Sequence, residues 1–272
     1  MDEQEHTYRR YFQIAGITLQ VESDLPMDRV KFALALQPFE VQKPGEDLVT
    51  LRHVFGLPEI KREEMGELLY QKAPWAIHRK GDSYVYLGIL PDLQYTGIYQ
   101  VAIFNKDHTY GIIYHPSVEE SRISQSGFTS LTLLVTDQIL VAQLLADRQG
   151  CYLHAAGAIL DGQGLLFVGH SSAGKSTTMR MLQNRAEILC DDRIIVRRWP
   201  EGFRIHGTWS HGELSDVSPN SAPLRAILFL KKSSKNELEL LTDRPSVVRQ
   251  LVACLIRPLV TRQWWGKKPG FG

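Results

Sequence analysis

Nine consecutive residues near the middle of the chain constrain its fold more than any other segment. An apolar stretch at residues 165–168 leads into them, and residues 175–184 are predicted to form a helix. The segment satisfies the pattern G-x-x-x-x-G-K-[S/T] in full. Two glycines in such a strand–loop–helix unit let consecutive backbone N–H groups turn inward toward an anion. The pattern predicts a phosphate-binding loop, and the alternative is an ordinary glycine-rich turn. The loop residues are Gly169, His170, Ser171, Ser172, Ala173, Gly174, Lys175, Ser176 and Thr177.

The side chains at the end of this loop predict which phosphates it binds. Lys175 offers a mobile ammonium group to the β and γ phosphates of a nucleoside triphosphate, and the Ser176 hydroxyl is placed to bind Mg²⁺. The N-terminus of the following helix adds partial positive charge. We therefore expect ATP and Mg²⁺ as cofactors. The sequence shows no motif that reads the base, so the choice between ATP and GTP stays open.

The segments on either side of the loop predict an α/β chain with two domains. Residues 1–120 form a β-rich N-terminal domain, and residues 121–272 form a P-loop catalytic domain of the kinase type. In the first domain, alternating apolar residues predict strands at 8–22, 83–104 (with a turn at Pro91-Asp92) and 110–114, and a short helix at 28–35. In the second, the expected helices are 128–148 and 246–260, and the expected strands are 151–160, 165–168, 187–190, 193–199 and 224–231.

Two adjacent carboxylates follow the strand expected at residues 187–190. Asp191 and Asp192 come fifteen and sixteen residues after Ser176. A carboxylate at a strand tip beside a P-loop is where Mg²⁺ is held in many phosphotransferases, and a second carboxylate can accept a proton from an attacking hydroxyl. The sequence does not say which of the two does which. The alternative is that the pair is a simple turn.

Two further features contain candidate site residues. His154 lies on the strand that folds back onto the P-loop strand, where a histidine is either catalytic or a satisfied core residue. Residues 206–213 lie between two strands and are rich in Gly, His and Glu. His211 or Glu213 is therefore a candidate to reach the metal or the substrate. The alternative for this segment is a polar surface loop. The predicted catalytic residues are Asp191, Asp192 and His154, and the predicted metal ligands are Ser176, Asp191 and Glu213.

Composition excludes several other classes of protein. The formal net charge of +1 over 272 residues argues against binding nucleic acid through bulk electrostatics. The pair Lys231-Lys232 is interpreted as solvated surface. Three widely spaced cysteines without a CxxC pair favour free thiols and a cytoplasmic setting. The N-terminus has no apolar signal-peptide region, and the most apolar long segment, residues 130–146, is too polar for a membrane span.

Together, these motifs resemble the catalytic domain of HPr kinase/phosphorylase. The match consists of Leu153-His154, the loop at 169–177 and Cys190-Asp191-Asp192-Arg193. The resemblance implies the fold shared with phosphoenolpyruvate carboxykinases, in which the P-loop sits in a mixed sheet. It also implies that His154 lies at the phosphate site and that the two aspartates supply a catalytic base and a metal partner. Because HPr kinases are hexamers, a homo-oligomer is expected.

The segment after residue 203 departs from that family. HPr kinases have a Glu-x-Arg-Gly signature, whereas this chain has Arg204-Ile205-His206-Gly207. Residues 207–213 resemble instead the Gly-Thr-Pro-Trp-x-Gly-Glu loop of HPr-kinase-like proteins found with peptide biosynthesis clusters. Some of those look like kinases of peptide precursors. This resemblance implies an ATP-dependent kinase that transfers the γ-phosphoryl group to a Ser hydroxyl of a peptide or small protein.

Two other functions remain open from the sequence. The missing acidic residue is consistent with a regulatory module that binds a nucleotide and transfers nothing. A small carboxykinase is allowed by the fold resemblance, although the chain shows no additional constellation for a second metal and oxaloacetate.

Overall fold

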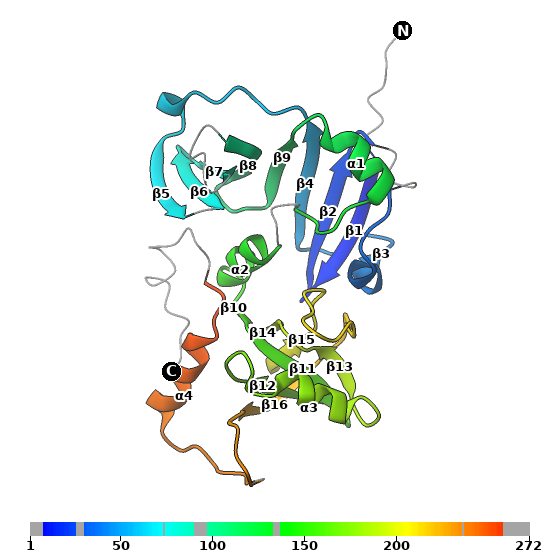
Figure 1. Ribbon diagram of the computed structural model, residues 1–272, viewed down its shortest axis with the longest axis vertical. Helices are drawn as coiled ribbons and strands as arrows, with labels where there is room; N and C mark the ends of the chain where they lie inside the picture. The colour runs from blue at the N-terminus through cyan, green and yellow to red at the C-terminus, as the bar shows by residue number, and fades with distance from the viewer. Residues whose placement is uncertain are drawn as a thin grey trace. The chain divides into compact units, whose positions relative to one another are not determined.

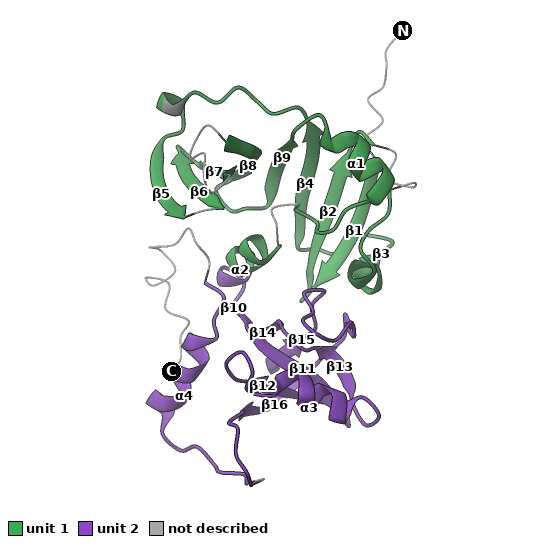
Figure 2. Ribbon diagram, in the orientation of Figure 1, with its two compact units in different colours: residues 1–144, 258–272 green, residues 145–257 purple. Residues whose placement is uncertain are grey.

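The computed structural model describes residues 8–25, 30–72, 74–89, 97–132, 137–235 and 237–257. It is a mixed α/β protein that is rich in strands, with two sheets and few helices (Figure 1). The chain forms two compact units, which divide between Leu144 and Leu145 (Figure 2). No helix in the described ranges is long and apolar enough to cross a membrane.

Unit 1 is built on a nine-stranded sheet in the order β3-β1-β2-β4-β9-β8-β7-β6-β5. The pairs β2·β4 and β4·β9 are parallel, and the others are antiparallel. Ala15 and Gly16 both have positive φ, which is the two-residue turn that matches the twist of a hairpin. The strands are β1 (Tyr8–Ile14), β2 (Ile17–Ser23), β3 (Glu40–Val41), β4 (Leu48–Phe55), β5 (Glu67–Lys72), β6 (Trp75–Lys80), β7 (Ser83–Ile89), β8 (Ile98–Asn105) and β9 (Tyr110–His115).

The helices of unit 1 differ from those expected. Of the helix expected at 28–35, residues 28 and 29 lie outside the described residues and residues 30–33 are not helical. A 3₁₀ helix, η1 (Leu34–Phe39), follows, and a second short 3₁₀ turn is η2 (Arg62–Glu64). Helix α1 (Glu119–Ser126) is not among the helices expected from the sequence, and it ends at Gly127, whose φ is 81°. The Pro91-Asp92 turn lies outside the described residues.

The long helix expected at 128–148 is wrong over residues 128–132, and residues 133–136 lie outside the described residues. Helix α2 covers only Gln138–Ala146. Phe128 instead bridges to Phe32, because its N–H donates to the Lys31 carbonyl at 2.8 Å and its own carbonyl accepts from Ala33 at 2.9 Å. Those bonds use the backbone groups that a helix would need. They also tie this segment to unit 1, so the unit ends later than the predicted boundary near residue 120.

Unit 2 contains a seven-stranded sheet in the order β10-β14-β15-β16-β12-β11-β13. Only β12 and β16 are parallel neighbours. The single strand expected at 151–160 is two strands, which separate at His154 and pair with different neighbours. The elements are β10 (Gly150–Leu153), β11 (Ala155–Leu160), β12 (Gln163–Val168), α3 (Lys175–Leu182), β13 (Glu187–Cys190), β14 (Ile194–Trp199), β15 (Gly202–His206), β16 (Ser221–Phe229) and α4 (Arg244–Ala253).

Alternate residues of β12 belong to two apolar clusters. Leu166 and Val168 pack in a cluster that includes Cys254, while Phe167 packs in a second cluster with Met179 of α3. Since neighbouring residues of a strand point to opposite faces, both faces of β12 are covered by apolar contacts. This explains why residues 165–168 read as a continuous apolar run.

The register of the sheet brings four chain segments to one edge. Ala155 of β11 pairs with Val168 of β12, Gly157 pairs with Cys190 of β13, and Val168 also pairs with Phe229 of β16. Strand β11 starts at this edge, whereas β12, β13 and β16 end there. His154, the P-loop, the aspartate pair and the segment after Phe229 therefore emerge together.

Candidate functional site

The phosphate-binding motif folds as a loop between β12 and α3. Its tip is a turn in which the Ala173 N–H donates to the His170 carbonyl at 3.0 Å. Gly174 caps the helix with φ of 105°, in a region that favours glycine. At Gly169 a Cβ would lie 2.6 Å from the Ala173 Cβ, so the first glycine is required by close packing inside the loop. The side chains of His170, Ser171, Ser172 and Thr177 are exposed.

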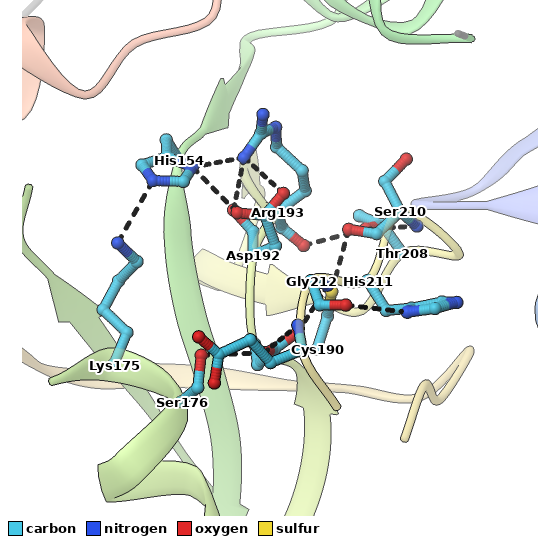
Figure 3. Close-up of polar contacts among 12 residues, drawn as sticks. His154, Lys175, Ser176, Cys190, Asp192, Arg193, Thr208, Ser210, His211 and Gly212 are labelled. Carbon is cyan, nitrogen blue, oxygen red and sulfur yellow. Dashed lines mark hydrogen bonds and ion pairs between the residues drawn. The ribbon is translucent and has the colours of Figure 1, made fainter. Parts of the chain in front are cut away.

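Lys175 is the buried cation of the loop. Only 7% of this residue is exposed, and its ammonium group donates to the carbonyls of Gly169 at 2.9 Å and His170 at 3.2 Å. Its third contact is the imidazole Nε2 of His154 at 3.1 Å (Figure 3). Burial lowers the pKa of Lys175, and the nearby Asp192 carboxylate opposes that change.

His154 connects the P-loop lysine to the aspartate pair. Its Nδ1 lies 3.0 Å from Asp192 Oδ1, while its Nε2 faces the Lys175 ammonium group (Figure 3). A lysine ammonium can only donate, so Nε2 accepts from Lys175. Nδ1 contacts both the Asp192 carboxylate, which accepts from an Nδ1–H, and the Arg193 guanidinium, which donates to a bare Nδ1, so these contacts do not select one tautomer. His154 thus links Lys175 to Asp192 through polar contacts at both of its ring nitrogens.

Asp192 is held by two basic neighbours. Its Oδ2 lies 2.6 Å from the Arg193 guanidinium, which also contacts His154 and donates to the Asp192 carbonyl at 2.9 Å. Burial alone would raise the pKa of this carboxyl. The hydrogen bond from His154 and the charge of Arg193 outweigh burial, so the pKa of Asp192 is lower than usual.

Asp191 has a different environment, because both of its oxygens accept hydrogen bonds from the protein. The residue is 2% exposed. Its Oδ1 accepts from the Gly212 N–H at 2.7 Å, and its Oδ2 accepts from Ser176 Oγ at 2.9 Å and from the N–H groups of Glu213 and Leu214 at 3.0 and 3.1 Å. A Cβ on Gly212 would lie 3.2 Å from both carboxylate oxygens. Asp191 therefore joins the loop at 212–214 to the start of α3.

The segment at 206–213 is more buried than a polar surface loop would be. Thr208 and Trp209 are buried, and the Thr208 hydroxyl donates to the Arg193 carbonyl at 2.8 Å. The Cys190 thiol donates to the Ser210 carbonyl at 3.3 Å, and burial raises the pKa of that thiol. These contacts fix the backbone that carries the two aspartates (Figure 3).

The structure brings together some of the predicted site residues and separates others. His154, Lys175 and Asp192 form one hydrogen-bonded chain, and Ser176 contacts Asp191. The carboxylate of Glu213 instead pairs with the exposed Arg180 at 3.1 Å, and only its backbone N–H reaches Asp191. The His211 side chain is exposed, and its Nδ1 lies 3.3 Å from the Gly212 carbonyl.

Two residues with clear roles in this geometry had no role in the sequence interpretation. Arg193 was visible only as the residue after the aspartate pair, and nothing in its neighbours indicates that it turns back onto Asp192 and His154. Gly212 stands in a run of polar residues, where its need for space beside Asp191 depends on a contact across 21 positions. A long-range contact of this kind leaves no local pattern in one sequence.

The donor set is suited to a metal ion that keeps most of its own water. Within the described residues, no group of three or more His, Cys, Asp or Glu side chains is placed to hold a metal. Mg²⁺ is commonly held by one or two protein oxygens together with substrate phosphates, rather than by a complete protein cage. The Ser176 hydroxyl and the Asp191 carboxylate, 2.9 Å apart, fit that smaller requirement.

Comparison with known families corrects the resemblance to HPr kinase. The family model that matches is that of the SynChlorMet cassette protein ScmC, over residues 124–253, and it is not an HPr kinase family. The assignment to HPr kinase/phosphorylase-like proteins is therefore wrong. A comparison with curated proteins gave no match. The match to ScmC covers just under half of the chain, so the chain is similar to that cassette protein over its P-loop-containing part.

Proposed function

We propose that the chain is an ATP-dependent phosphotransferase, in which a P-loop unit transfers the γ-phosphoryl group to a Ser hydroxyl of a peptide or small protein. The observation that carries this proposal is the hydrogen-bonded chain Lys175–His154–Asp192. Through His154, this chain links the lysine of the phosphate loop to a carboxylate that could accept a proton. Three free cysteines are consistent with action in a reducing cytoplasm.

The reaction follows from the positions of these groups. Lys175 would give up its bonds to the Gly169 and His170 carbonyls and donate to phosphate oxygens instead. The acceptor oxygen attacks the γ-phosphorus, the bond from that phosphorus to the bridging oxygen breaks, and ADP leaves. Asp192 accepts the hydroxyl proton. Ser176 and Asp191 would hold Mg²⁺ once the Ser176 hydroxyl is released from its bond to Asp191, and the ion would neutralise charge on the phosphates.

The two aspartates have different roles in this proposal. Asp191 accepts four hydrogen bonds from the protein, so it acts by positioning Ser176 and the 212–214 backbone. Asp192 is half-buried and is bonded through only two side-chain neighbours. A carboxylate with room for another contact is the better proton acceptor, so we assign the base to Asp192.

Two substitutions test the proposal. Lys175→Ala should weaken ATP binding in calorimetry at least tenfold, since a buried charge-assisted contact to phosphate is lost. Asp192→Asn should keep ATP binding within a few-fold and lower transfer of labelled phosphate to a panel of Ser-containing peptides by about 100-fold. Asp161→Asn is the matched control, because Asp161 lies in an exposed turn with φ of 49° that asparagine also tolerates.

ATP binding that is unchanged in Lys175→Ala would contradict the assignment of the phosphate loop. Transfer that is unchanged in Asp192→Asn would contradict the assignment of the base. Binding of ATP without transfer to any peptide or protein would contradict the whole proposal of phosphotransfer.

A second candidate function is a nucleotide-binding regulatory module without transfer. The observation that favours it is that the polar groups of the site already satisfy one another: Lys175 bonds to three protein acceptors and Asp191 to four protein donors. A module of this kind needs phosphate binding and no base. Asp192→Asn would then leave both ATP binding and the interaction with a partner unchanged, and no turnover would be detected in the wild-type protein.

A further inference from the structure

The hairpin that joins β14 to β15 borders a cavity that the function proposed above does not use. The cavity has a volume of about 350 Å³ and is lined by Gln149, Arg198, Trp199 and Pro200, all of which belong to unit 2. The backbone N–H of Arg198 donates to the Gln149 carbonyl at 3.0 Å, which fixes the turn at residue 149 against β14. The volume is that of a small-molecule site, and the walls combine an indole ring with an amide and a guanidinium.

Trp199 gives this cavity a fixed aromatic wall. Its indole N–H donates to His206 Nε2 at 3.2 Å, and the Arg197 guanidinium lies 4.4 Å from the centre of its ring. A guanidinium held over an indole is an attractive cation–π contact. Because these two contacts hold the ring in place, a planar ligand can stack on it without first ordering it.

The same hairpin has an excess of positive charge. Arg197 of β14 lies directly opposite Arg204 of β15, and like charges in that position repel each other. Their charges add to burial in lowering the pKa of His206. Residues 147–149 and 197–204 contain four arginines and two acidic residues, which are Asp147 and Glu201. The balance of charge around the cavity therefore favours an anion.

Arg198 is the cavity residue that can bind this anion. Its side chain is exposed, and among the described residues it has no hydrogen-bond or ion-pair partner. Glu201 is exposed in the turn of the same hairpin and does not pair with it. A guanidinium whose N–H groups are unused can bind two oxygens of one phosphate through parallel hydrogen bonds.

We propose that the β14–β15 hairpin binds a nucleoside monophosphate in this cavity. The base would stack on Trp199, the Gln149 amide would bond to its polar edge, and Arg198 would bind the phosphate. A phosphate alone would leave the indole wall unused, and an uncharged ring would leave the excess of positive charge unused. The proposal is independent of phosphotransfer, because it uses no residue of the phosphate loop and neither aspartate of the pair.

Calorimetry on the full-length wild-type protein with three probes tests this assignment. The probes are AMP, adenosine, which lacks the phosphate, and ribose 5-phosphate, which lacks the base. AMP should bind at least tenfold more tightly than either of the others, and its affinity should fall as salt is raised. If adenosine or ribose 5-phosphate binds as tightly as AMP, the site does not combine a stacking wall with a phosphate contact, and the proposal is overturned.

Substitutions in the cavity separate the two contacts. Arg198→Gln should weaken AMP binding at least fivefold and leave adenosine binding unchanged, whereas Trp199→Leu should weaken both. Trp199→Phe should retain most of the affinity for AMP, because it keeps a ring on which the base can stack. If Trp199→Phe loses as much affinity as Trp199→Leu, the stacking contact is wrong.

A charge-matched control separates the cavity from general electrostatics. Arg185 is exposed in the same unit and forms no ion pair with any described residue, so Arg185→Gln makes the same change in net charge. That variant should bind AMP like the wild-type protein. Equal loss of AMP affinity in Arg185→Gln and Arg198→Gln would overturn the proposal, because the effect would then be one of net charge alone.

Lys175→Ala distinguishes this cavity from the P-loop. AMP lacks the β and γ phosphates that the P-loop is expected to bind, so its affinity should stay within twofold of the wild-type value in this variant. If Lys175→Ala removes AMP binding and Arg198→Gln leaves it unchanged, AMP occupies the P-loop and the proposal fails. If AMP binds with the expected pattern and no phosphate is transferred to any peptide, the cavity site is supported and the phosphotransferase proposal fails.

Discussion

Two adjacent carboxylates in this chain have opposite environments. Asp191 is 2% exposed and accepts three backbone N–H bonds and one hydroxyl bond, whereas Asp192 is half-buried and meets an imidazole and a guanidinium. The sequence left open which one is the base, because neighbouring residues at a strand tip look alike. The hydrogen-bond partners distinguish them, since Asp191 accepts four bonds from the protein, whereas the Asp192 carboxylate contacts two side chains.

Arg193 contributes to the low pKa of Asp192, and this contribution predicts how the reaction depends on pH. The pKa of Asp192 is below its usual value, so its charged form is present at neutral pH and is lost only as pH falls through that low pKa. In Arg193→Met, only His154 and Lys175 still oppose burial, so the pKa of Asp192 should rise. The acidic limb of kcat/KM should then move to higher pH.

The control for this shift keeps the charge. Arg193→Lys should leave the acidic limb closer to that of the wild-type protein, and Arg180→Gln, which removes an exposed pair with Glu213, should not move it. If the acidic limb of the kcat/KM profile does not move in Arg193→Met, Asp192 does not titrate as the base.

At the scale of elements, the sequence predicted most strands of the unit 2 sheet and missed one of them. The segments at 165–168, 175–184 and 187–190 are confirmed as β12, α3 and β13 with small changes at their ends. The apolar runs of β12 and β13 are continuous because their residues pack in both apolar clusters. Strand β15 (Gly202–His206) was missed, since Arg204 and His206 stand in it and its pairing with β14 and β16 supplies the stability.

The candidate site was predictable only where a local sequence motif marks residues that also contact one another in the folded protein. The P-loop motif is a local pattern, and so is an Asp pair at a strand tip. His154 was found because the expected hairpin placed it opposite the loop, and the break between β10 and β11 at this residue had no local signal. The contacts of Arg193 and Gly212 depend on the folded loop after β15, which no spacing rule encodes.

A short segment near residue 255 holds His154 in place, and its hydrogen bonds give a second prediction. The backbone N–H of His154 donates to the Cys254 carbonyl at 2.7 Å, and the backbone N–H of Ile256 donates to the Tyr152 carbonyl at 2.8 Å. Ile256→Pro removes the second donor, which should cost about 1–3 kcal/mol in the free energy of unfolding. It should also lower kcat more than it weakens ATP binding, because the imidazole moves while the P-loop stays intact.

Ile256→Val is the matched variant for this test, since it keeps the N–H and most of the apolar side chain. Thermal unfolding with and without ATP measures the stability, and labelled phosphate transfer measures kcat. A proline variant with normal kcat and reduced stability would show that the segment supports the fold without positioning His154.

At the scale of the whole molecule, each unit contains buried histidines that stay neutral. In unit 1, Gln100 donates to His115 Nδ1 at 3.0 Å, the His115 Nε2 lies 2.9 Å from His53 Nδ1, and the His53 Nε2 lies 2.9 Å from the Leu131 carbonyl. One neutral tautomer of each ring satisfies the whole chain. In unit 2, His206 accepts a hydrogen bond from Trp199 Nε1 at 3.2 Å.

Burial lowers the pKa of all three rings. For His115 the value falls to about 4, with Glu119 opposing and Arg122 reinforcing the change. For His206 it also falls to about 4, reinforced by Arg204 and Arg197. For His53 it falls well below the usual value, through burial and the neighbouring His115, against the bond to Leu131. Each unit should therefore lose stability on acidification.

The sign and the size of this effect can be stated for each unit. Between the usual histidine pKa of 6.5 and about 4, the unfolded chain binds protons that the folded chain does not, so stability is full above 6.5 and falls as pH decreases. A shift of this size corresponds to a loss on the order of 3 kcal/mol per ring.

Hydrogen exchange between pH 7 and pH 5, corrected for the intrinsic rate, should show protection falling in β4 and β9 and in β14 and β15. His115→Gln should reduce the pH dependence in unit 1 alone, since His53 stays buried there, and His206→Gln should remove it in unit 2 alone. If either variant removed it in both units, protection would report one cooperative unfolding of the whole chain, and the assignment of a separate acid-sensitive histidine site to each unit would be wrong.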